Sequence, residues 1–123
     1  MRVLLSIKPE FAESILAGEK RFEFRKSIFR NKEVKTVVIY ATMPVGKVIG
    51  EFDIGTILAR EPGELWQETK KYAGITRAFF DAYFMKRATG FAIEIKNPKR
   101  YTEPLTLSEM VPGAVPPQSF RYI

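Results

Sequence analysis

The sequence contains 123 residues, 46% of them hydrophobic and 13% aromatic, a composition typical of a globular chain with one core. Neither cysteine nor histidine is present, which excludes disulfides, thiolate nucleophiles, Ser-His-Asp triads and Cys/His zinc sites. The formal net charge is +6, and residues 20–35 alone hold seven basic and two acidic side chains. Because concentrated positive charge attracts polyanions, nucleic acid is the first partner to consider.

The sequence lacks the usual signals for export or membrane insertion. No apolar run approaches the roughly 18 residues that a membrane-spanning helix needs. The charged and proline residues at positions 8–10 interrupt the short apolar stretch near the start. We therefore expect a cytoplasmic protein, folded as a single domain over residues 1–123, that does not bind a membrane. We also expect no cofactor and no metal ion, and the oligomeric state is left open.

The first elements in chain order are a strand, a short helix and a second strand. Residues 2–7 are largely apolar and predict a buried strand, and residues 9–17 predict a helix whose first turn begins with proline. Gly18 can adopt the left-handed conformation that ends such a helix. In residues 22–25, two phenylalanines alternate with charged residues, which is the period of a half-buried strand.

The remaining elements predict the fold class. A basic loop follows, and then strands are predicted over 36–42 and 47–58. A helical insert over 61–87 comes next. Two further strands, over 89–95 and 101–107, are separated by a turn at 98–100, and the tail docks on the body. Glycines inside the strands indicate bulges of a curved sheet. We predict an α+β fold, a small mixed β-barrel of five to six strands with one helix after the first strand and a two-helix insert.

The segment 18–26 carries the main chemical signal. If its phenylalanines face the core, Lys20, Glu23 and Arg25 point outward together. An acid flanked by two bases suits the binding of a polar ligand. The alternative is an exposed strand face with incidental ion pairs, which are common and weak. The aromatic stripe of the insert (Phe79, Phe80, Tyr83, Phe84) has the spacing of a core-facing helix, although such rings can also stack on bases.

Several segments together resemble the ASCH domain family of the PUA-like superfamily. The central pattern is Gly18-x-Lys20-x-x-Glu23-x-Arg25, preceded by Ser6-Ile7-Lys8-Pro9 and a helix with Ile-Leu. Further similarity lies at residues 40–45, 49–52, 75–80 and 116–120. The later segments are similar to a prokaryotic subgroup described as PUA-like transcriptional regulators. The resemblance covers nearly the whole chain.

The resemblance implies a nucleic-acid-binding barrel whose cleft is lined by the positions of Lys20, Glu23 and Arg25. Some family members hydrolyse the acetyl group of N4-acetylcytidine with a lysine, a threonine and a glutamate. Lys20 matches that lysine, whereas Glu23 stands where the threonine would be. Residues 71–74, in the region of the glutamate, contain no acid.

The leading hypothesis is a module that binds RNA or another nucleic acid. Its candidate ligands include a modified or flipped base and a modified nucleoside. Regulation of transcription or translation is one candidate role. Basic side chains would neutralise phosphates, and Glu23 would accept hydrogen bonds from an exocyclic amine or a ribose hydroxyl. The candidate binding residues are Lys8, Lys20, Glu23, Arg25, Lys26, Tyr40, Thr42, Lys47, Gln118, Ser119 and Arg121.

Two other function classes remain open. The first is a hydrolase acting on a nucleoside or RNA, either like the N4-acetylcytidine amidohydrolases or a ribonuclease, with Lys20 and Glu23 as its catalytic residues. That chemistry requires burial to lower the pKa of Lys20, whereas an ion pair with Glu23 would keep the lysine protonated. The second is a protein-interaction module, which would need Trp66 and the aromatic helix to form an exposed patch.

Overall fold

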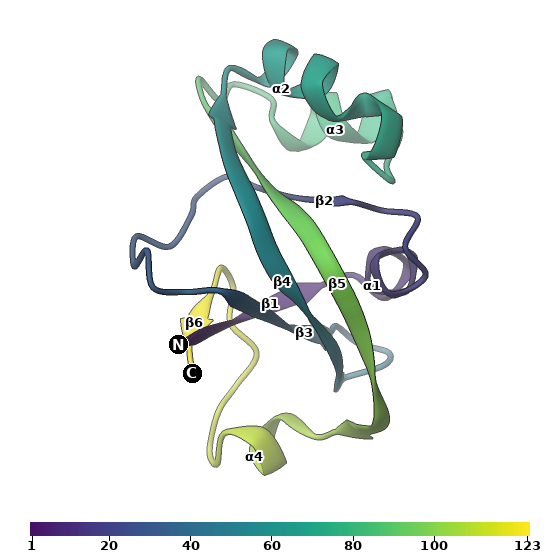
Figure 1. Cartoon of the computed structure of the whole chain (residues 1–123), viewed down its shortest axis with the longest axis vertical. Coiled ribbons are helices and arrows are strands. Elements are labelled where there is room, and N and C mark those ends of the chain that lie inside the picture. Colours follow the sequence, from purple (N-terminus) through teal and green to yellow (C-terminus); the bar gives the residue numbers. More distant parts are fainter.

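The computed structural model describes every residue from Met1 to Ile123. Its strands are β1 (Arg2–Ile7), β2 (Phe22–Arg25), β3 (Thr36–Ala41), β4 (Lys47–Arg60), β5 (Gly90–Leu105) and β6 (Arg121–Tyr122). Its helices are α1 (Pro9–Leu16), α2 (Pro62–Thr69), the 3-10 turn η1 (Lys70–Tyr72), α3 (Arg77–Tyr83) and α4 (Leu107–Met110). The long strands β4 and β5 cross the molecule, with α2 and α3 at one end and α4 at the other (Figure 1). None of these helices has the length and apolar character required to cross a membrane.

The six strands form one mixed sheet in the order β2-β5-β4-β3-β1-β6. Strands β1 and β3 are parallel, and the other neighbouring pairs are antiparallel. The sheet curls into a half-barrel, which confirms the predicted α+β fold with its helix after the first strand and its helical insert. Strands β2 and β6 lie at the two ends of the sheet order and do not pair with each other.

Three hydrophobic clusters hold the elements together. The largest joins α1 and the loop after β2 to the inner sheet, with Phe52 and Ile93 fully buried. The second joins the helical insert to β2 and β5 through residues such as Phe24 and Phe80. The third lies around Tyr40 and Leu107 next to α4. The second cluster fixes α3 beside β2, and this packing forms one wall of the site described below.

Local signals in the sequence explain where the helices begin and end. Both α1 and α2 have proline in their first turn, where its missing N–H leaves no partner unsatisfied. The hydroxyl of Thr76 accepts a hydrogen bond from Phe79 N at 3.1 Å, as expected for the residue that caps α3. Gly18 follows α1 with a φ of 81°, the left-handed conformation that closes a helix.

The prediction of two strands separated by a turn at residues 98–100 was wrong. Strand β5 continues through this region and stays paired with β4, since Lys99 lies opposite Glu51 and Arg100 opposite Gly50. Asn97 has a φ of 48°, which asparagine tolerates, and the register between the two strands shifts nearby. The polar residues therefore mark a bulge that bends a long strand, and they do not reverse its direction. The short helix α4 was not predicted.

Candidate nucleic-acid interface

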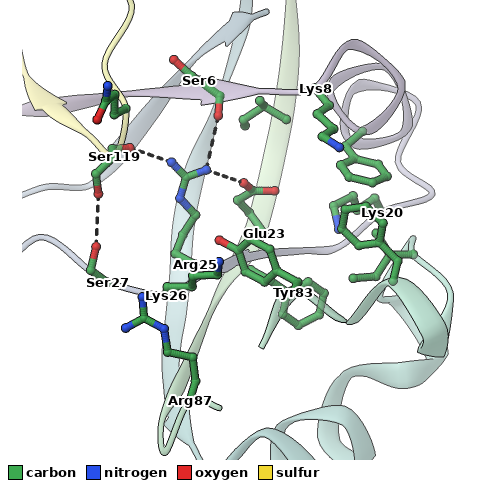
Figure 2. Close-up of a pocket in the computed structure, with 16 residues that line it drawn as sticks. Ser6, Lys8, Lys20, Glu23, Arg25, Lys26, Ser27, Tyr83, Arg87 and Ser119 are labelled. Carbon is green, nitrogen blue, oxygen red and sulfur yellow. Dashed lines mark hydrogen bonds and ion pairs between the residues drawn. The ribbon is translucent and has the colours of Figure 1, made fainter. Parts of the chain in front are cut away.

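A cavity of about 590 Å³ lies between α1, β2, α3 and the C-terminal tail. We call it the Lys20 cavity, and Figure 2 shows the side chains that line it. Seven candidate residues from the sequence line it, namely Lys8, Lys20, Glu23, Arg25, Lys26, Gln118 and Ser119. The motif after α1 and the docked tail, distant in the sequence, thus meet at one site.

Lys20 lies at the buried side of the cavity and is only 1% exposed. Its Nζ donates a hydrogen bond to the carbonyl oxygen of Ala73 at 2.7 Å. The same atom lies 5.3 Å from the ring centroid of Phe11 and 4.9 Å from that of Phe24. Such cation–π contacts stabilise an ammonium group only in part, because the rings replace water that would solvate the charge fully.

Burial lowers the pKa of Lys20 from 10.5 to about 8, and the negative charge of Glu23 opposes this change. Lys20 and Glu23 do not form an ion pair, since the carboxylate of Glu23 pairs with Arg25 instead. Lys20 is thus a proton donor at neutral pH that can release its proton slightly above it. This is the condition that the hydrolase hypothesis set for Lys20.

Gly74 permits the buried position of Lys20. A Cβ atom at Gly74 would lie 2.5 Å from Lys20 Cγ and 2.6 Å from its Cβ, closer than real side chains approach. The φ of Gly74 is 70°, which also favours glycine. Residues 71–74 therefore provide Lys20 with a backbone carbonyl and free space, and no carboxylate of this segment lines the cavity.

Arg25 joins the two ends of the curled sheet. Its Nη1 donates to Glu23 Oε2 at 3.0 Å and to the Ser6 carbonyl oxygen of β1 at 3.3 Å, and its Nη2 donates to the Ser119 carbonyl oxygen at 2.6 Å (Figure 2). Ser6 and Ser119 belong to β1 and the tail, whereas Arg25 belongs to β2 at the far end of the sheet. The guanidinium group thus links strands that share no backbone hydrogen bonds.

Glu23 keeps one carboxylate oxygen free for a ligand. The residue is only 5% exposed, and Oε2 is occupied by Arg25. Oε1 has no hydrogen-bond partner, yet the protein has no fully buried side-chain oxygen or nitrogen without one. Oε1 must therefore be reached by solvent, and Glu23 lines the cavity. The cavity offers an acceptor at Glu23 and an ammonium donor at Lys20.

Aromatic rings of α3 and exposed lysines line another part of the cavity. Phe79 and Tyr83 of α3 are stacked with an angle of 12° between their planes, and Phe11 packs edge-on against Phe79. The Lys8 ammonium lies 5.1 Å from the Phe79 centroid, and the Lys26 ammonium lies 4.7 Å from the Tyr83 centroid. Burial raises the pKa of Tyr83, an effect that Arg25 opposes and Glu23 reinforces. This part of the cavity combines flat apolar faces with positive charge.

The sequence pattern placed the aromatic stripe of α3 in the core, and only half of it lies there. Phe80 and Phe84 are buried in the second cluster, whereas Phe79 and Tyr83 are half-buried and line the cavity. Arg87, Ser27 and Ile75 also line it and were not candidates. No local signal in the sequence separates the two halves of the stripe, because all four rings share the spacing of one helix face.

Four candidate residues lie outside the Lys20 cavity. Tyr40 is buried in the third cluster with Leu4 and Leu107, although its neighbour across the strand pair, Ser6, lines the cavity. The other three residues, Thr42, Lys47 and Arg121, do not line the cavity either. The continuous apolar run of β3 has no alternation that would show to which face Tyr40 points, and this side chain packs in the core. No cluster of three or more Asp or Glu side chains forms a metal-ion site.

The family model described as the ASCH domain matches residues 5–104. The chain belongs to the ASCH domain family. An ASCH domain-containing ribonuclease from Zymomonas mobilis is 31% identical over 122 residues, which cover 98% of this chain and 82% of that protein. Two Ureaplasma parvum proteins named large ribosomal subunit protein uL22 are 30% identical over 124 residues, but this ASCH chain spans only 39% of their length.

Solved structures support the same family relationship. The crystal structure of ASCH from Zymomonas mobilis has a TM-score of 0.92 and 28% identity, and the match covers 99% of this chain and 87% of that chain. A tyrosine-to-phenylalanine variant of the same protein gives a TM-score of 0.91. The predicted resemblance of the chain to the ASCH domain family is thereby confirmed.

Proposed function

We propose that this ASCH domain binds RNA and that one unpaired nucleotide enters the Lys20 cavity. The observation that carries the proposal is the combination of a buried donor at Lys20 Nζ and a free acceptor at Glu23 Oε1 with the aromatic rings of α3 in the same cavity. Bases present hydrogen-bonding edges and flat π-faces, and single-stranded RNA exposes both. The name of the Zymomonas mobilis relative, a ribonuclease, supports RNA as the polymer.

The rim of the cavity supplies the charges that a nucleotide requires. Lys8, Lys26 and Arg87 line the cavity, are exposed, and take part in none of the ion pairs of the chain. Free cations at the mouth suit phosphate groups, while the buried donor and acceptor suit the base edge. Arg25 has a different role, because its donors are already directed at Glu23, Ser6 and Ser119. A modified base is an additional candidate, since the cavity falls in the size range of small-molecule sites.

The test is RNA binding by three variants at two salt concentrations. Lys20→Met and Glu23→Gln should each weaken binding about tenfold or more, because each removes a hydrogen bond made in a desolvated site. Lys99→Met is the matched control, since Lys99 is an exposed lysine that lines no cavity. Wild-type binding should fall between about 50 and about 200 mM salt. Equal affinity of all four proteins would refute the cavity as the binding site.

A second candidate function is RNA cleavage, favoured by the lowered pKa of Lys20 and by the name of the relative. In this reaction the ribose 2′-oxygen attacks the adjacent phosphorus, the bond from phosphorus to the 5′-oxygen breaks, and a 2′,3′-cyclic phosphate forms. Glu23 would take the proton from the 2′-hydroxyl, and Lys20 would give a proton to the departing 5′-oxygen. The cleavage assay compares RNA with an oligomer carrying 2′-deoxyribose at every position, which must remain intact.

Hydrolysis of N4-acetylcytidine receives less support from the geometry. The segment that faces Lys20 provides the carbonyl oxygen of Ala73 and no carboxylate. Incubation with the acetylated nucleoside tests it directly, and release of acetate would overturn the preference for RNA cleavage. Binding without any turnover would leave an RNA-binding role, for which regulation of gene expression is one use.

A further inference from the structure

A second cavity of about 610 Å³ lies between the loop that follows β2 and strands β4 and β5. Its lining combines Ile54, Ile57 and Phe91 from the sheet with Arg30, Lys32 and Lys35 from the loop. We call it the loop groove. In Figure 1 this loop projects on the side of the view opposite to α1. The groove therefore pairs an apolar floor with a basic rim.

The loop that forms the rim is held in place by the core and the tail. Phe29 and Val34 are buried in the largest hydrophobic cluster, which anchors the loop at two points. The Tyr122 hydroxyl accepts hydrogen bonds from Arg30 N at 3.2 Å and Asn31 N at 3.3 Å. These anchors fix the backbone between them, so the basic side chains project from a defined surface.

The basic side chains of the rim have no partners of their own. Arg30, Lys32 and Lys35 are exposed and take part in none of the ion pairs of the chain. The loop also contains Glu33, but it remains positively charged overall. Unpaired cations beside an apolar floor attract a ligand that combines phosphates with bases. Phe91 lines the groove, is only half-buried, and takes part in none of the aromatic pairs of the protein.

Neighbouring residues of the chain line the loop groove and the Lys20 cavity. Ser27 lines the Lys20 cavity and its neighbour Ile28 lines the loop groove, so the two sites are adjacent along the chain. We propose that the loop groove binds nucleotides of single-stranded RNA on either side of the nucleotide that enters the Lys20 cavity. This inference rests on the proposed function. A basic groove with an aromatic platform is the arrangement that tracks a single strand. A second copy of this chain fits less well, because each copy carries a net charge of +6.

The experiment compares two fluorescein-labelled RNA oligomers, one of about three and one of about twelve nucleotides, since a single strand of the greater length spans both sites. The groove variant is Arg30→Ser, Lys32→Ser and Lys35→Ser combined, and Lys99→Ser is the single-charge control. The groove variant should bind the long oligomer about tenfold or more weakly at about 0.1 M salt, with the slope of log K against log salt reduced by about two. Its affinity for the short oligomer should stay within about twofold of wild type. Phe91→Leu should lower the affinity for the long oligomer about fivefold and leave the affinity for the short oligomer unchanged.

Each possible result decides between the two proposals. If the groove variant binds the long oligomer as tightly as wild type does, and Lys20→Met lowers the affinity for both oligomers, the groove proposal is wrong and the cavity proposal stands. If neither oligomer binds wild-type protein, both proposals fail. If wild type forms dimers in sedimentation and Ile57→Asp alone makes it monomeric, the groove is a contact between copies, which also overturns its assignment to RNA.

Discussion

Lys20 and Arg25 belong to the same basic segment, but the fold surrounds them in different ways. Arg25 donates to one carboxylate and two carbonyl oxygens, so its charge is well compensated although it is mostly buried. Lys20 has one carbonyl acceptor and two aromatic rings, and its pKa falls to about 8. The comparison separates a cation that holds the fold together from one that is buried at a cost in stability, and the proposed RNA contact uses the second.

The largest effect is expected for Arg25→Met, which leaves the Glu23 carboxylate buried without a partner and frees two carbonyl oxygens. Breaking a buried pair in this way should lower the free energy of unfolding by about 3–5 kcal/mol. Urea or thermal unfolding measures the loss. The matched control is Arg21→Met, since exposed Arg21 only stacks on Tyr72 at 4.1 Å, and it should cost under about 1 kcal/mol.

A rescue experiment separates the charge from the packing of Arg25. Adding Glu23→Gln to Arg25→Met removes the unpaired carboxylate and should recover about 1–2 kcal/mol. If the double variant is less stable than Arg25→Met by itself, the lost stability comes from the hydrogen bonds by which Arg25 joins β2 to β1 and the tail. The explanation by an unpaired Glu23 carboxylate would then be wrong.

The second prediction is that Lys20→Met stabilises the protein while it abolishes the proposed RNA contact. A pKa lowered from 10.5 to about 8 means that the folded state binds the proton less tightly, a penalty of about 3 kcal/mol at neutral pH. The variant removes this penalty but loses the hydrogen bond to Ala73, which leaves a net gain of about 1–2 kcal/mol.

The pH dependence supplies the check on Lys20. Below pH 8 the penalty is present in full, and it disappears as the pH rises toward 10.5, because the lysine then becomes neutral in both states. The stability advantage of Lys20→Met should therefore shrink between about pH 8 and about pH 10. An advantage that is constant over this range would show that better packing, and not a buried charge, is the cause.

The third prediction concerns Gly74 and uses Gly18 as its pair. Both glycines have positive φ, so alanine carries a similar backbone penalty of about 1–2 kcal/mol at each. A Cβ at Gly18 meets no atom within 4 Å, whereas one at Gly74 collides with the side chain of Lys20. Gly74→Ala should therefore be the less stable variant and the only one of the two that weakens RNA binding. Equal RNA affinities would show that Lys20 need not occupy its present position.

The sequence predicted the motif end of the site better than its tail end. Alternation in β2 placed Glu23 and Arg25 on one face of the strand, and both line the cavity. The expectation that Lys20 and Glu23 point outward was wrong, because both side chains are buried in the cavity between α1, β2, α3 and the tail. The carbonyl acceptors of Arg25 carry no sequence signal, because Ser6 and Ser119 contribute backbone oxygens that any residue would supply. Their positions follow from the docking of the tail, which is a tertiary event.

The division of the α3 rings was similarly hidden from the sequence. Phe79, Phe80, Tyr83 and Phe84 share the spacing of one broad stripe, and the boundary between core and cavity runs through it. The angle at which α3 packs on β2 sets that boundary, and contacts such as the edge-on pair of Phe24 and Phe80 determine the angle. A local pattern defines a helix face, but the partner surface decides which part of it stays open.

The smallest effect is expected for Ser119→Ala, although Ser119 was a candidate binding residue. Its carbonyl oxygen, which the substitution keeps, accepts the bond from Arg25, while its hydroxyl bonds only to Ser27 Oγ at 3.1 Å on the exposed rim. The free energy of unfolding should change by less than about 0.5 kcal/mol, as for other surface substitutions. RNA affinity should stay within about twofold of wild type, because the hydrogen bond from Arg25 to the carbonyl oxygen of residue 119 is retained. A loss of affinity without a loss of stability would instead place the Ser119 hydroxyl in direct contact with RNA.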